Sequence, residues 1–129
     1  MRYLLDTHTL IWMREGNSRL RRSKWEPLWN DPANEVYFSI VNLWEIAIKR
    51  ALGKLTLEDG LEDFSQALQI AHGFRLLPVE VHHLSRLESL PPHHGDPFDR
   101  LLIAQAIELA AQAVTDDPLW KKYAVKCAW

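Results

Sequence analysis

The 129-residue sequence is poor in several residue types, and each shortage excludes a class of protein. The single cysteine, Cys127, excludes an intrachain disulfide and a cysteine-rich zinc site, and it suits a reducing compartment. Only five glycines are present, and no glycine-rich phosphate loop occurs among them. Apolar runs are short, and Asp6 interrupts the N-terminal one too early for a signal peptide. We therefore expect a cytoplasmic protein that does not associate with membranes.

Basic and acidic residues are nearly equal in number, so neither sign of charge dominates. Fifteen Lys and Arg against 17 Asp and Glu give a net charge of −2, so composition alone does not indicate a nucleic-acid-binding protein. The densest basic run is Arg19, Arg21, Arg22 and Lys24, which is followed by two tryptophans. Such a run is typical of a solvated helix face, but it also suits contact with a phosphate backbone.

Short apolar runs alternate with segments of helical periodicity along the whole chain. We predict strands at 3–5, 36–38, 75–77 and 113–115 and a last one starting near Val125. Helices are predicted after Thr7 and over 40–52, 61–71, 81–90, 98–113 and 118–123. The alternation predicts one α/β domain over residues 1–129, with a central parallel sheet and helices on both faces.

Acidic side chains follow or precede these elements where a parallel sheet binds ligands, outside the carboxyl ends of its strands. Asp6 ends the first strand, Asp116 and Asp117 follow the fourth, and Asp96 and Asp99 open the helix at 98. Helix capping is the competing explanation, because Asp96 and Asp117 each precede a proline and Asp99 stands at a position that completes a capping box.

Glu45 is harder to explain by local structure. Its helical neighbours Val41 and Ile48 are apolar, so the carboxylate lies beside an apolar stripe, where a charge is costly unless it is paired or binds a metal. Lys49, four residues on, is the alternative partner. Together the four distant carboxylates indicate a site for a hard cation, Mg²⁺ or Mn²⁺.

The histidine pairs His82–His83 and His93–His94 are a competing source of metal ligands. Adjacent side chains on a helix point apart, and the spacing matches no zinc motif. We therefore expect these histidines to lie on the surface or in loops.

Four segments resemble, in order, the motifs of the PIN-domain ribonucleases, and among these the sequence is similar to the VapC-type toxins of toxin–antitoxin pairs. The segments are 3–8 (YLLDTH), 42–46 (NLWEI), 96–106 (DPFDRLLIAQA) and 114–117 (VTDD). The resemblance implies a PIN-like α/β fold and metal-dependent hydrolysis of RNA. The residues that it places at the metal are Asp6, Glu45, Asp99 and Asp117.

The resemblance also implies supporting residues and partners. Thr115 matches a threonine that orients the last acids, and its Thr-x-Asp spacing favours Asp117 over Asp116 as the ligand. Thr7, Asp96 and Asp116 are further supporting candidates. It implies a cognate antitoxin and a homodimer. Six tryptophans, more than a core of this size usually needs, agree with an interface.

Three other functions are weighed against this one. A haloacid-dehalogenase-like phosphatase would need a second Asp two residues after Asp6, where His8 stands. A receiver domain would need a central phosphoacceptor at a strand end, whereas Glu58 and Asp59 lie outside any predicted strand. A non-catalytic binding module on the PIN fold is disfavoured by the presence of all four acids.

Overall fold

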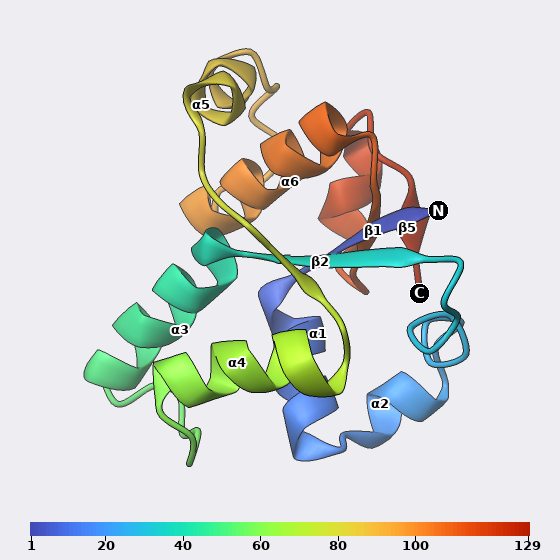
Figure 1. Ribbon diagram of the computed structural model, residues 1–129. Helices are drawn as coiled ribbons and strands as arrows, with labels where there is room; N and C mark the ends of the chain where they lie inside the picture. The colour runs from blue at the N-terminus through green and yellow to red at the C-terminus, as the bar shows by residue number, and fades with distance from the viewer.

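The structure, a computed structural model that describes residues 1–129, contains one five-stranded parallel sheet (Figure 1). The strand order is β3-β2-β1-β4-β5, and Leu4 at the centre of β1 lies opposite Tyr37 and Ala113 in its two neighbours. This confirms the predicted α/β fold. The strands are β1 (Arg2–Leu5), β2 (Glu35–Ser39), β3 (Arg75–Leu77), β4 (Gln112–Val114) and β5 (Cys127–Ala128).

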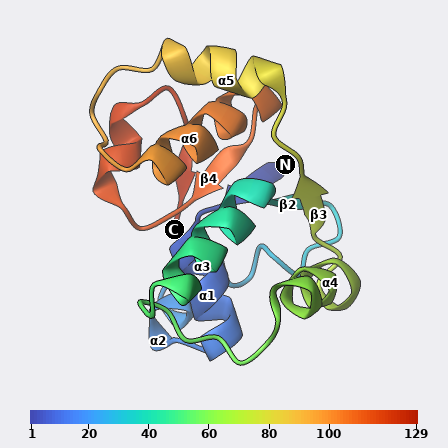
Figure 2. The same ribbon diagram turned by 90° about the vertical axis from the view of Figure 1, so that its left-hand side faces the viewer.

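Helices cover both faces of the sheet (Figure 2). They are α1 (Thr7–Glu15), α2 (Ser18–Arg21), α3 (Ile40–Ala51), α4 (Leu61–Ala71), α5 (Val81–Glu88), α6 (Pro97–Leu109) and the 3₁₀ helix η1 (Pro118–Lys122). Helices α1, α2 and α4 share one apolar core with the sheet, and α6 and η1 share the other. Helix α3 contributes to both, with Leu43 and Ile46 in the first and Val41 in the second. None of the helices is long and apolar enough to cross a membrane.

The structure differs from the sequence-based expectation most clearly at three elements, and α5 also ends two residues earlier than expected, at Glu88. Helix α6 ends at Leu109 rather than at residue 113, because Ala110 takes a left-handed conformation (φ 55°) and β4 begins two residues later. Alanine rarely adopts this conformation, so the sequence carries no stop signal there. The short helix α2 was not predicted, and β5 begins at Cys127 rather than near Val125.

The junction of β2 and α3 is fixed by a capping box next to the carboxyl edge of the sheet. Ser39 caps α3 as predicted, and the Asn42 side chain accepts the Ser39 backbone N–H in return. The Asn42 amide also donates to the Leu5 carbonyl and to the Thr7 hydroxyl, at 3.2 and 3.1 Å. The start of α3 is thereby tied to the end of β1, where Asp6 lies.

Candidate active site

The predicted acidic residues come from four elements that meet at the carboxyl edge of the sheet. Asp6 directly follows β1, and Asp117 follows the neighbouring strand β4. Glu45 lies on α3, and Asp99 lies in the first turn of α6. The carboxyl ends of parallel strands share one edge, so the strand order brings the first two acids together, and the contact of α3 with α6 brings the other two.

Asp6 is buried, and both of its carboxylate oxygens accept hydrogen bonds. One oxygen caps α1 by accepting the Thr9 N–H at 2.7 Å, and the other accepts the Thr115 hydroxyl at 2.5 Å. Burial raises the pKa of Asp6, although the hydrogen bonds from Thr115 and Thr9 oppose the increase. Asp6 is therefore both a helix cap and a carboxylate held at a fixed orientation.

Glu45 is only 2% exposed, and its two oxygens have different surroundings. Lys49 donates to Oε2 at 2.5 Å, whereas Oε1 is buried without any hydrogen-bond partner. Burial would lower the pKa of Lys49, but the hydrogen bond and the charge of Glu45 raise it. The expected pair with Lys49 is therefore present at one oxygen, and the other oxygen is a buried acceptor without a partner.

Asp99 does not close a capping box. Asp96 caps α6 alone, with one oxygen that accepts the Phe98 and Asp99 N–H groups. The Asp99 carboxylate faces the other acids instead. Burial raises its pKa to about 7, and the charges of Asp96, Glu45 and Asp6 add to the increase, while His94 opposes it. By distance, Asp99 and Asp117 come together with His94, with atoms within 4.8 Å of one another, and the charges of Glu45 and Asp6 also act on Asp99.

Asp117 and its neighbour Asp116 occupy different positions. Asp117 Oδ1 caps η1 through the Leu119 N–H at 2.9 Å, and its backbone N–H donates to the Thr115 hydroxyl. Because that hydroxyl itself donates to Asp6, Thr115 links Asp6 and Asp117 directly. Asp116 is exposed and lines a hollow beside β5.

The expectation that the paired histidines lie on the surface or in loops was wrong for His83 and holds for His94, although the His94 ring is turned inward. His83 is buried on α5, where its Nδ1 accepts the Glu80 N–H at 2.9 Å. His94 lies in a loop, but its imidazole is directed inward: Nε2 is 2.8 Å from Asp117 Oδ2 and 3.1 Å from Asp99 Oδ2. The sequence gives no spacing from which this contact could be inferred, because it depends on the path of the loop before α6.

The predicted basic run lies on α2 and in the turn after it. Arg19, Arg21, Arg22 and Lys24 are all exposed, and the Arg19 guanidinium lies over the Trp12 ring at 5.0 Å. Lys24 lines the same hollow as Asp116 and Thr115. One end of the basic run therefore reaches the side of the acidic site.

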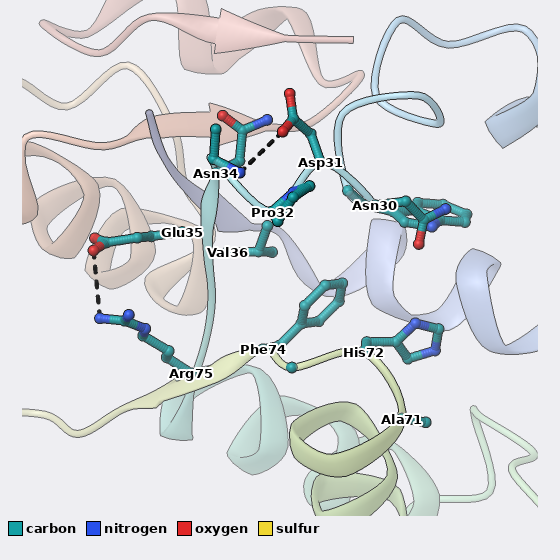
Figure 3. A pocket seen from close by; sticks show the side chains of 13 residues that line it. Asn30, Asp31, Pro32, Asn34, Glu35, Val36, Ala71, His72, Phe74 and Arg75 are labelled. Atoms are coloured by element: carbon teal, nitrogen blue, oxygen red, sulfur yellow. Dashed lines mark hydrogen bonds and ion pairs between the residues drawn. The ribbon is translucent and has the colours of Figure 1, made fainter.

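The largest hollow of the molecule is not at the acidic site. It measures about 520 Å³ and lies at the amino ends of β2 and β3 (Figure 3). Glu35 there pairs with Arg75 and Arg2, and Asp31 accepts the Ala33 N–H of its own turn. These acids are already engaged within the fold, whereas the acids at the carboxyl edge of the sheet are not fully paired.

The donor set at the carboxyl edge fits a divalent cation. The four carboxylates supply the oxygen donors that Mg²⁺ and Mn²⁺ prefer, and the unpartnered Glu45 Oε1 is a buried acceptor that a cation would satisfy. His94, Asp99 and Asp117 each offer an atom within 4.8 Å of the others. Lys49 is the cation that pairs with Glu45, and His94 contacts both Asp99 and Asp117.

Comparisons with known structures agree with the fold. The chain is similar to VapBC2 from Rickettsia felis bound to a DNA fragment from their promoter, with 15% identity, a TM-score of 0.71 and coverage of 98% of this chain and 97% of that one. FitAcB from Neisseria gonorrhoeae has 18% identity and a TM-score of 0.60. VapBC-1 from nontypeable Haemophilus influenzae has 16% identity and a TM-score of 0.61. Both of the latter matches cover 98% of this chain and 96% of the other.

Sequence comparison assigns the family. No curated protein matches the chain at a significant level. The family profile described as the PIN domain matches residues 3–126, nearly the whole sequence. The chain therefore belongs to the PIN domain family.

Proposed function

We propose that the protein is a metal-dependent endoribonuclease and the toxin of a VapC-type toxin–antitoxin pair. The observation that carries the proposal is the meeting of four carboxylates at the carboxyl edge of a PIN-domain sheet, one of them with a buried oxygen that has no partner. A purely structural role does not account for this set, since like charges in a partly buried site destabilise a fold. Binding of a cation explains both the cluster and the open oxygen.

The proposed metal ligands are Asp6, Glu45, Asp99 and Asp117. When bound, Mg²⁺ or Mn²⁺ lowers the pKa of a water molecule and offsets the charge of a phosphodiester. The chain's own residues prepare this site. Thr115 holds one oxygen of Asp6, and Lys49 holds one oxygen of Glu45, so that the remaining oxygens keep a fixed direction.

Asn42, Thr7 and Asp96 support the site through the backbone. Asn42 joins the ends of β1 and β2 through the Leu5 carbonyl and the Thr7 hydroxyl, and Asp96 fixes the first turn of α6. These contacts hold the elements that carry the acids. We assign these residues positioning roles rather than contact with substrate.

We propose that the RNA backbone follows the basic run on α2. Arg19, Arg21, Arg22 and Lys24 offer exposed cations, and Lys24 lines a hollow together with Asp116 and with Thr115, the residue that donates to Asp6. Lys121 of η1 also lines this hollow and supplies a further cation. Cations beside an anionic site are needed for phosphate binding, because the acids alone would repel the substrate.

The proposed partners are a cognate antitoxin and a second copy of the chain, with the complex in the cytoplasm. The structures that resemble this one include VapBC complexes, which supports an antitoxin partner. For the homodimer we propose the outer face of α3. There Ile40, Trp44, Ile48 and Leu52 follow each other every four residues and form an exposed apolar row.

Trp44 distinguishes this row from an ordinary surface. It is 53% exposed, whereas Trp12, Trp25 and Trp120 are buried. Its ring also packs against Phe98 at 4.8 Å, next to Asp99. A dimer formed through this row would therefore border the acidic site.

The experiment compares three outcomes on purified protein with Mg²⁺ or Mn²⁺. An RNA labelled at an internal position is expected to give internal fragments, which identifies an endonuclease. Release of inorganic phosphate from a phosphate monoester without internal cleavage would instead support the phosphatase alternative. Binding of RNA without either reaction would support a non-catalytic module and contradict the proposal.

A further inference from the structure

The imidazole of His94 is held in the acidic site by a clamped loop. The loop over 91–95 precedes α6, and Arg100 of that helix donates to the carbonyls of Pro91 and Leu90 at 3.0 and 3.4 Å. The Tyr123 hydroxyl accepts the His94 backbone N–H at 2.7 Å. The loop backbone is thus fixed from two sides, and the His94 side chain is only 9% exposed.

Hydrogen bonding settles which ring nitrogen carries the proton. The Asp96 N–H donates to His94 Nδ1 at 3.1 Å, so Nδ1 is an acceptor and cannot carry a proton in this arrangement. The proton of the neutral ring therefore lies on Nε2. From there it is donated to Asp117 Oδ2 at 2.8 Å and lies 3.1 Å from Asp99 Oδ2.

This arrangement excludes His94 as a metal ligand through Nε2. A ligating nitrogen needs its lone pair free, which would move the proton to Nδ1 and direct it at the Asp96 N–H. A cation held by Asp99 Oδ2 and Asp117 Oδ2 would need the lone pairs that now face His94. Those two oxygens already flank the Nε2–H group, so the ion and the imidazole need the same space.

We infer that His94 and a divalent cation compete for the carboxylates of Asp99 and Asp117, so that His94 sets the metal affinity of the site. This rests on the proposed metal site. Binding an ion to both carboxylates requires the imidazole to leave, and the measured affinity is reduced by the fraction of molecules in which it has left. The hydrogen bond to a carboxylate favours the state in which the imidazole lies between Asp99 and Asp117. Removal of the imidazole is therefore expected to tighten metal binding by about tenfold.

The variant test measures Mn²⁺ binding to the full chain by calorimetry, without RNA. His94→Ala is expected to bind Mn²⁺ about tenfold more tightly than the wild type. His93→Ala is the matched control: His93 is the exposed neighbour in the same loop, with its ring against Tyr123, and its loss should leave the affinity unchanged. Weaker or unchanged binding by His94→Ala would overturn the inference.

A measurement on the wild-type protein keeps the test valid if His94→Ala does not fold. Nitrogen–proton correlation spectra of the histidine rings report which nitrogen is protonated. We expect the Nε2–H form of His94 without Mg²⁺, and a shifted signal that is still Nε2–H at saturating Mg²⁺. A change to Nδ1–H would show ligation, and an unmoved signal would show that the imidazole stays in place; either contradicts competition.

The two proposals fail in different ways. If the wild type binds no divalent cation at millimolar concentration, the proposed function and the inference both fall. If the wild type binds Mn²⁺ but His94→Ala binds it no more tightly, only the competition is refuted.

Discussion

Replacing Asp99 by Asn should stabilise the protein without metal, and increasingly so at higher pH. The pKa of Asp99 is raised from 3.8 to about 7, so between these values the folded protein binds a proton that the unfolded chain has released. Stability from this group is therefore complete below about pH 4 and is lost as the pH rises to about 7. Because Asn cannot ionise, the Asp99→Asn variant does not lose this stability as the pH rises.

The size of the effect follows from the pKa shift. About three pKa units correspond to a ceiling of about 4 kcal/mol in the free energy of unfolding. Since the side chain keeps 16% of its exposure and water relaxes around the charge, we expect about half of this, roughly 2 kcal/mol. Asp99→Asn should thus match the wild type near pH 4 and exceed its stability by roughly 2 kcal/mol near pH 8.

The assay is urea unfolding in EDTA across this pH range. Asp63→Asn is the control, because Asp63 is an exposed acid at the third position of α4, as Asp99 is in α6. It should lose about 0.5 kcal/mol near pH 8 through the helix dipole, with no gain on raising the pH. A stability difference for Asp99→Asn that does not depend on pH, or a less stable variant near pH 8, would refute the reasoning.

Three further predictions follow from the site and the surface. Asp117→Asn should keep the cap of η1, because Asn caps as well as Asp, and should leave the melting temperature unchanged or slightly raised. RNA cleavage by this variant should fall by orders of magnitude. Asp96→Asn changes a residue that acts as a cap, so its effect in the same cleavage assay should be milder. Replacing Arg21 and Arg22 by Gln should weaken RNA binding and flatten its salt dependence, and an unchanged slope in a salt titration would return them to a solvated surface. Trp44→Ser should shift sedimentation at tens of micromolar from dimer toward monomer, and a wild type that is already monomeric would contradict the proposed α3 interface.

The fold was predictable because its signals are local. Ser39 marks the start of α3, and the Asp–Pro pairs mark the starts of α6 and η1, all of which the structure confirms. The end of α6 was not predictable, because Ala110 adopts its left-handed conformation without a glycine. The helix ends at this left-handed residue, and β4 begins two residues later.

The candidate site was predictable as a set of acids but not as a geometry. Strand order placed Asp6 and Asp117 at one edge, which the rule for parallel sheets anticipates. Sequence spacing could not show that Glu45 keeps one oxygen open while Lys49 binds the other. It also could not place His94 between Asp99 and Asp117, because that contact depends on how Arg100 and Tyr123 hold the loop before α6.

The central claim is that the carboxylates hold a catalytic cation, and RNA cleavage by the wild type and by Asp6→Asn tests it most directly. Wild-type cleavage should stop in EDTA and return when Mg²⁺ or Mn²⁺ is restored. Asp6→Asn should stay folded, because Asn preserves the cap of α1, and should lose cleavage by orders of magnitude. Cleavage that survives EDTA, or near-normal cleavage by Asp6→Asn, would contradict the account.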